Sequence, residues 1–215
     1  IIYDIFKRIN TGGKALNNQE MRNAVSTNYT RKLLNLCTES EEFLSATNRR
    51  VKTLRLDHHE LVLRFFAFHR IYDFEAKKVN YQSSNIVDLL NDENEKLNKI
   101  ISQESLSQYL EIFKTSMRRC FKLFGDKAFV KVSYNKEKEE YEYSMLINKP
   151  LFSAFSVILA NREYENINFG NYSQIALDKL SQKLEDPINF MSISTSTNSK
   201  SKVENYFKMC QEVID

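Results

Sequence analysis

The sequence contains few of the residues that interrupt regular structure: it has only four glycines, two prolines and no tryptophan among its 215 residues. β-Sandwiches and β-barrels join many short strands through turns rich in glycine and proline, so this scarcity argues against an all-β fold. No uninterrupted run of about 18 apolar residues occurs, and we therefore expect no membrane span. The first residues show neither a methionine start nor a signal-peptide pattern, and we expect the chain to be a fragment of a longer protein.

Cysteine and net charge are also low. The three cysteines, Cys37, Cys120 and Cys210, are far apart and form no CxxC pair. This spacing argues against a zinc site and against a disulfide framework, and it favours a reducing, cytoplasmic location. The net charge is +3, an excess too small to indicate a nucleic-acid-binding protein by itself.

Most of the chain shows helical periodicity in its apolar residues. Hydrophobic residues make up 42% and charged residues 27%, which are globular values. Between 129 and 145 apolar residues alternate instead, as in a short β-hairpin. We therefore predict a mainly α fold, a multi-helix bundle with one short hairpin near 129–145. The expected helices cover residues 1–9, 17–25, 28–46, 57–72, 86–101, 106–124, 150–159, 172–185 and 203–213, with a loop over 192–201.

Local signals define the ends of several helices. Asn17 followed by Glu20 has the spacing of a capping box, and Asp57 followed by Glu60 repeats it. Gly125 is placed as a carboxy-terminal cap. Within 106–124, Phe121 falls on the apolar stripe, and we expect it in the core.

The string from Asn10 to Lys14, with Arg8 just before it, is the most informative in the chain. Its two adjacent glycines let backbone amides approach a ligand closely, and the flanking cations suit a phosphate. It is not a Walker A loop, because it lacks that spacing and follows a predicted helix. Two interpretations stay open: a plain interhelical turn, or an anion or nucleotide contact.

The adjacent His58 and His59 are candidate metal ligands by residue type. Adjacent residues point about 100° apart on a helix, and neither histidine has a partner four residues on. A capped helix start accounts for this segment better than a metal site does, and we assign no metal ligands.

A second candidate is a basic line on the helix over 106–124, formed by Lys114, Arg118, Arg119 and Lys122. It lies opposite the apolar stripe, where it is either a solvated face or a track for a phosphate backbone.

Four groups of residues spread along the chain share the pattern of one protein family. Together they resemble the GmrS/GmrD-type restriction proteins, whose shared region is called domain of unknown function 262. The first group is the most specific and the last is the weakest. The groups are Ile5-Phe6-Lys7-Arg8-Ile9-Asn10-Thr11-Gly12-Gly13 with Leu16, Gln19-Glu20 and Arg22-Asn23-Ala24; Asp57, Glu60, Leu63-Arg64-Phe65 and Ala67-Phe68; Phe124-Gly125-Asp126-Lys127-Ala128-Phe129 with Ile147-Asn148-Lys149-Pro150-Leu151-Phe152; and Thr197, Lys202-Val203 and Phe207.

The resemblance implies a bacterial restriction or antiphage-defence context. Such proteins carry a ParB-like amino-terminal domain with an Asp-Gly-Gln-Gln-Arg motif linked to nucleotide hydrolysis, and many end in an HNH-type nuclease. Neither motif occurs in these 215 residues. The resemblance thus implies that 1–75 is the end of a ParB-like domain and 76–215 a helical carboxy-terminal module. A nucleoside triphosphate with Mg²⁺ would belong to the parent protein, and this chain alone is not expected to be catalytic.

Residue roles follow from the same resemblance. Arg64 would either reach the nucleotide pocket or pair with Glu60. Asn10 would orient a ligand and Arg8 would neutralise a phosphate. The nucleotide- or phosphate-binding candidates are therefore Arg8, Asn10, Thr11, Gly12, Gly13 and Arg64, and the residues expected to brace this loop are Glu20, Arg22 and Asn23.

Three functions stay open at this stage. The first is a fragment of a nucleotide-dependent restriction or defence protein, with the missing amino-terminal half as its partner. The second is a non-enzymatic helical module that binds DNA or a partner protein, a second copy of the chain included. The third, ranked last, is a metal-dependent hydrolase around His58 and His59.

Overall fold

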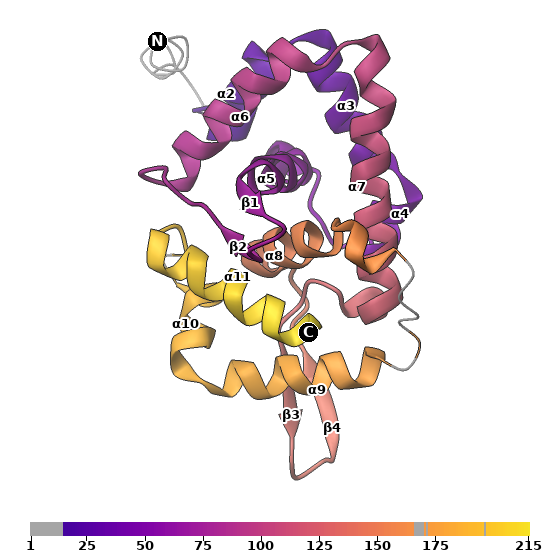
Figure 1. Ribbon diagram of the computed structural model, residues 1–215, viewed down its shortest axis with the longest axis vertical. Helices are drawn as coiled ribbons and strands as arrows, with labels where there is room; N and C mark the ends of the chain where they lie inside the picture. The colour runs from indigo at the N-terminus through magenta and orange to yellow at the C-terminus, as the bar shows by residue number, and fades with distance from the viewer. Residues whose placement is uncertain (1–14, 166–169, 171, 196) are drawn as a thin grey trace.

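The computed structural model describes residues 15–165, 170, 172–195 and 197–215. Within these residues the chain forms ten α-helices and two small antiparallel two-stranded sheets, which confirms the mainly α prediction (Figure 1). The helices are α2 Asn18–Val25, α3 Asn28–Glu39, α4 Glu41–Ala46, α5 Asp57–Ile71, α6 Ile86–Ile100, α7 Gln103–Phe124, α8 Lys149–Leu159, α9 Tyr172–Glu185, α10 Pro187–Ser194 and α11 Lys200–Ile214, and the strands are β1 Tyr72–Asp73, β2 Lys78–Val79, β3 Val132–Asn135 and β4 Glu140–Tyr143.

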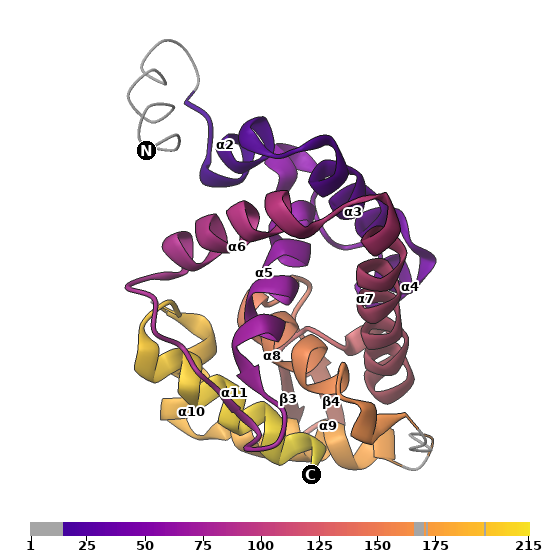
Figure 2. The same ribbon diagram turned by 45° about the horizontal axis from the view of Figure 1, so that its top comes forward.

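Helices α5 and α8 form the centre of the molecule. Every residue from 150 to 159 in α8 is buried, and α5 is buried on most of its surface. Both helices pack against each other, and α8 also packs against α7 and α11. In Figures 1 and 2, α3, α6 and α7 surround α5 on one side, while α9, α10 and α11 close the opposite end.

The predicted hairpin is confirmed, and it projects past α9 (Figure 1). Strands β3 and β4 pair so that Val132 lies opposite Tyr143 and Tyr134 lies opposite Tyr141. Alternation places these four side chains on one face of the hairpin. Because β3 also packs against α9, the hairpin and the helix enclose a space between them.

Two of the predicted helix ends are confirmed. The Asn17 side chain accepts a hydrogen bond from the Glu20 amide at 2.8 Å, and the Glu20 carboxylate accepts one from the Asn17 amide at 2.7 Å. This reciprocal pair is the predicted capping box. Helix α7 ends at Gly125, whose φ of 59° and ψ of −139° lie in a region that glycine reaches without strain.

The start of α5 differs from the prediction. Leu56 is the residue before the helix, in a left-handed conformation with φ of 63°, and Arg55 before it has φ of 57°. Asp57 is therefore the first helical residue, and its side chain does not cap the helix. The carboxylate of Glu60 does not bond back to the helix start and contacts cations instead, as described below.

The sequence missed two elements between its predicted helices. The sequence predicted a helix that ends at residue 185 and no helix after it, but Pro187 opens α10, which continues into the predicted loop as far as Ser194. Asp186 caps this helix, its side chain accepting from the Ile188 amide at 2.7 Å, and proline suits the first helical position. The second missed element is the short ribbon of β1 and β2.

The expectation that Phe121 belongs to the core is wrong: its side chain is 43% exposed. Phe121 follows Cys120, which is fully buried. Phe121 points about 100° away from Cys120 around α7, and there it lies beyond the arc of the helix that is buried.

A single hydrophobic cluster extends from Leu33 to Val213. Phe68, for example, contacts both Tyr81 and Phe207, with ring centroids 6.2 Å and 5.2 Å apart. The cluster therefore crosses residue 75, and the division of the chain at that point stays a prediction. No helix in the described part of the chain is long and apolar enough to cross a membrane.

Candidate functional site

Five of the predicted ligand-contacting residues lie outside the described residues. These are Arg8, Asn10, Thr11, Gly12 and Gly13, in the segment before residue 15. The predicted bracing residues and Arg64 are described, and they are the starting point for the site.

Glu60 is the centre of a charged cluster between α2, α5 and α8. Its Oε1 accepts from the Nε of Arg64 at 3.1 Å and from the Nζ of Lys149 at 3.0 Å. Its Oε2 lies 3.5 Å from Nη2 of Arg22. Lys149 also lies 3.5 Å from Oδ1 of Asp57. We refer to Asp57, Glu60, Arg64, Arg22 and Lys149 as the Glu60 cluster.

The surroundings of Glu60 strongly favour its ionised form. Burial alone would raise the pKa of this carboxyl, but Arg64, Lys149 and Arg22 outweigh it and lower the pKa to about 2. Counted over the described residues alone, the cluster contains three cations and two carboxylates, one positive charge in excess. Arg22, Arg64 and Glu60 are mostly buried, whereas Lys149 and Asp57 lie at the surface, where the cluster can attract an anion.

The two arginines differ in how many of their guanidinium donors are occupied by hydrogen bonds within the fold. Arg22 is 1% exposed, and it also donates from Nε to Gln19 at 2.8 Å and from Nη1 to Asn91 at 3.2 Å. Arg64 is 8% exposed, and among the described residues no hydrogen bond uses its two terminal nitrogens. Arg22 is thus fixed in the fold, while Arg64 has a planar pair of donors left for a ligand.

The other two predicted bracing residues, Glu20 and Asn23, make their contacts outside the cluster. The Glu20 carboxylate, besides its part in the capping box, pairs with the Nη2 of Arg55 at 2.7 Å. The same guanidinium donates to the backbone oxygen of Ala15. The backbone oxygen of Asn23 accepts a hydrogen bond from Nη1 of Arg31 at 3.3 Å. Glu20 therefore braces the chain just before α2, whereas Arg22 belongs to the cluster itself.

Most of the predicted basic line on α7 is paired within the molecule. Lys114 and Arg118 both contact Oε1 of Glu42, at 3.1 Å and 3.0 Å, and Arg118 also pairs with Glu111. Arg119 donates from Nη1 to two backbone oxygens, of Leu159 at 2.9 Å and Asn161 at 2.7 Å. Of the four, only Lys122 makes no such contact through its side chain to the described residues. Lys114 and Arg118 are thus paired with carboxylates, and Nη1 of Arg119 is occupied by backbone oxygens, which leaves fewer donors of the line for a nucleic acid.

Burial disfavours the charged forms of the histidines and of the cysteines. Burial lowers the pKa of His59, with a further contribution from His58, to about 4. Among the described residues no group of three or more histidine, cysteine, aspartate or glutamate side chains is placed to hold a metal ion. All three cysteines are fully buried, and burial raises the pKa of each thiol, so the thiolate that a nucleophile requires is disfavoured.

Lys149 is the member of the Glu60 cluster that was not assigned a role from the sequence. It is the first residue of α8, where a cation is disfavoured by the positive end of the helix dipole. This misplaced charge next to Pro150 is the local signal that could have marked Lys149. Its partner Glu60 is 89 residues away in the chain, so no local pattern predicts their contact.

Comparison of the chain with protein-family models, with curated proteins and with solved structures finds no match. The geometry of the Glu60 cluster and the short motifs of the sequence are therefore the basis for a functional proposal.

Proposed function

We propose that this chain is the helical part of a nucleotide-dependent DNA restriction or antiphage-defence protein of the GmrS/GmrD type, in which the Glu60 cluster contacts a phosphate group of the nucleotide. In this proposal the chain supports and orients the nucleotide, and the hydrolytic chemistry belongs to the Asp-Gly-Gln-Gln-Arg motif that these residues lack. The observation that carries the proposal is the convergence of Arg22, Arg64 and Lys149 on one carboxylate, with positive charge in excess.

The chemistry of the cluster suits a phosphate. Glu60 holds the cations in place before a ligand arrives, which reduces the entropy lost on binding. The free edge of Arg64 matches two phosphate oxygens in a bidentate contact. The amino-terminal ends of α5 and α8 meet at the cluster through the contact between Asp57 and Lys149, and such ends favour negative charge.

Calorimetric titration with ATP and Mg²⁺ tests the proposal on this chain. We expect binding by the unsubstituted chain and a loss of about tenfold or more in Arg64→Ala, because a bidentate charged contact is removed. Arg8→Ala and Asn10→Ala should weaken binding as well if the segment before α2 shares the site. Arg49→Ala is the matched control, since Arg49 pairs with Glu41 on an exposed surface.

The results separate a binding site from a structural network. Arg64→Lys should recover part of the affinity, because it keeps the charge but lacks the planar fork. No binding by the unsubstituted chain, or equal binding by Arg64→Ala and Arg49→Ala in folded proteins, would make the cluster purely structural.

A second proposal is the non-enzymatic binding module. Contact with DNA through the basic line has little support from the pairing of Lys114, Arg118 and Arg119, but a protein partner is favoured by large apolar side chains exposed on α10. Ile188 is 70% exposed and Met191 is 52% exposed. Sedimentation equilibrium tests a second copy of the chain as that partner: an oligomer that dissociates in Ile188→Glu would support it, and a monomer in both would contradict it.

A further inference from the structure

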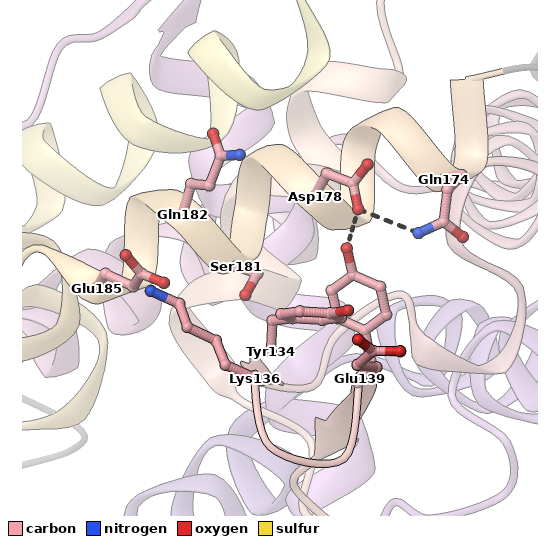
Figure 3. Close-up of a pocket in the computed structure, with 9 residues that line it drawn as sticks. Tyr134, Lys136, Glu139, Gln174, Asp178, Ser181, Gln182 and Glu185 are labelled. Carbon is pink, nitrogen blue, oxygen red and sulfur yellow. Dashed lines mark hydrogen bonds between the residues drawn. The ribbon is translucent and has the colours of Figure 1, made fainter.

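A pocket of about 640 Å³ lies between the β3–β4 hairpin and α9, built from residues that the Glu60 cluster does not share (Figure 3). The helix supplies one stripe of polar side chains, and the hairpin supplies two tyrosines and the charged residues of its turn. Figure 1 shows this hairpin and α9 at the opposite end of the molecule from α2. The pocket is therefore a separate candidate for ligand binding.

The charge of the pocket is opposite to that of the chain. Three carboxylates line it, from Glu139, Asp178 and Glu185, against the single ammonium group of Lys136. In Figure 3, Lys136 extends from the hairpin toward Glu185 on α9. A net negative pocket in a protein of net charge +3 favours a cationic ligand.

Two tyrosines give the pocket an aromatic wall. Tyr134 and Tyr141 face each other across the hairpin, with ring centroids 5.1 Å apart and planes inclined at 60°. Tyr134 is 41% exposed, so part of its ring is open to a ligand. Aromatic faces attract ammonium and guanidinium groups through their quadrupole, and carboxylates beside them strengthen that attraction.

One carboxylate is held in position by the fold. Oδ1 of Asp178 accepts hydrogen bonds from the Tyr141 hydroxyl and, at 3.0 Å, from Nε2 of Gln174. Among the described residues, no hydrogen bond reaches its other oxygen. Asp178 is thus fixed through one oxygen and has the second available as an acceptor.

Ser181 supplies an independent sign of a missing partner. Its side chain lines the pocket and is 3% exposed, yet its hydroxyl makes no hydrogen bond. Figure 3 shows this hydroxyl directed from α9 toward the hairpin. A buried hydroxyl without a partner is destabilising unless something bonds to it, and a ligand donor in the pocket would do so.

We propose that this pocket binds the alkylammonium groups of a linear organic polycation. Asp178 and Glu185 are seven residues apart on one face of α9, which separates them by about 10.5 Å along the helix axis and suits two amines joined by an extended aliphatic chain. The same groups occur in a free polyamine and in the lysine side chains of a peptide, and the two sources present the same chemistry to the pocket.

Calorimetry with two probes of similar charge tests the proposal: spermidine, and a blocked peptide that carries two lysines. The chain is expected to bind at least one of them. Glu139→Gln should weaken binding by about fivefold, as for loss of one exposed charge pair. Glu137→Gln is the matched control, because it removes the same charge from the same turn at a residue that does not line the pocket. Lys136→Gln should strengthen binding by a similar factor, since it removes the resident competitor.

Ser181→Ala separates ligand binding from folding. It should weaken binding while leaving the thermal midpoint unchanged or higher, because the hydroxyl has no partner in the fold. Tighter binding of the peptide would identify lysine side chains as the source, and tighter binding of spermidine would identify a free polyamine. Failure of both probes to bind, or equal weakening by Glu137→Gln and Glu139→Gln, would overturn the proposal.

Discussion

At the scale of single residues, Glu60 decides whether several buried charges are tolerated. Arg22 is almost fully buried and Arg64 nearly so, and both contact this carboxylate. Removing one partner of a buried ion pair is more damaging than replacing the whole pair, because the remaining charges stay desolvated. Glu60 is thus a stability determinant as well as a member of the candidate site.

Glu60→Gln should lower the free energy of unfolding near neutral pH by on the order of 3 kcal/mol, the equivalent of its pKa shift. The folded pKa is depressed, so this contribution is present above about pH 4.5 and is lost as the pH falls toward 2. Urea unfolding of both proteins at a series of pH values measures it. The difference between them should shrink below pH 4.5, and a difference that stays constant down to pH 2 would contradict the assignment. Glu137→Gln, an exposed change of the same kind, is the control.

At the scale of elements, α7 shows what hydrophobic periodicity predicts and what it does not. Its apolar stripe correctly indicated a long helix, and the burial of Phe113 and Cys120 follows that stripe. The periodicity did not show which residues at the margin of the stripe are buried. Phe121 was therefore assigned to the core, although its side chain is exposed. Which residues at the margin of a stripe are covered depends on the neighbouring elements, and a single helix does not reveal them.

Phe113→Ala should therefore destabilise the protein by about 3–5 kcal/mol, because it opens a cavity among Phe43, Phe65 and Phe66. Phe121→Ala, in the same helix, should change stability by less than about 1 kcal/mol. Chemical denaturation of the two variants compares them directly. Equal losses would show that Phe121 is packed in solution.

The same limit applies to the candidate site. Local sequence was enough to suggest two contacts, because each joins residues three or four apart. These are the capping box of Asn17 with Glu20 and the pairing of Glu60 with Arg64. The contacts that complete the cluster join Glu60 to Arg22 on α2 and to Lys149 on α8. Such contacts depend on how whole helices pack, so they lie beyond any single-sequence pattern. The nucleotide role of the segment from Arg8 to Gly13 stays a prediction.

At the scale of the whole molecule, many charged side chains are paired with opposite charges inside the fold, which the net charge of +3 does not reveal. The basic line of α7 is the main example, because Glu42 holds both Lys114 and Arg118. The pKa of Glu42 is lowered: burial acts to raise it, but a backbone hydrogen bond and the two cations outweigh burial. Neutralising Glu42 would remove the carboxylate that Lys114 contacts, while Arg118 would keep Glu111, so the α7 face would gain positive charge.

We expect Glu42→Gln to bind duplex DNA more tightly than the unsubstituted chain and with a steeper dependence on salt, because each additional phosphate contact releases counterions. Fluorescence anisotropy with a labelled duplex at several salt concentrations measures both. Glu41→Gln, one residue away and paired with exposed Arg49, should have a smaller effect. An affinity that is unchanged in Glu42→Gln would show that the α7 face is not a latent DNA surface.

The burial of the three cysteines turns them into internal reporters of how the molecule opens. Cys37 lies on α3, Cys120 on α7 and Cys210 on α11, so each samples a different helix. In variants that retain one cysteine and carry alanine at the other two, a thiol reagent can react only after local or global opening. One common labelling rate would mean that the helices open together as one cooperative unit. A faster rate at Cys37 than at the other two would mean that the chain before residue 75 opens separately. Such a result would support the predicted domain boundary.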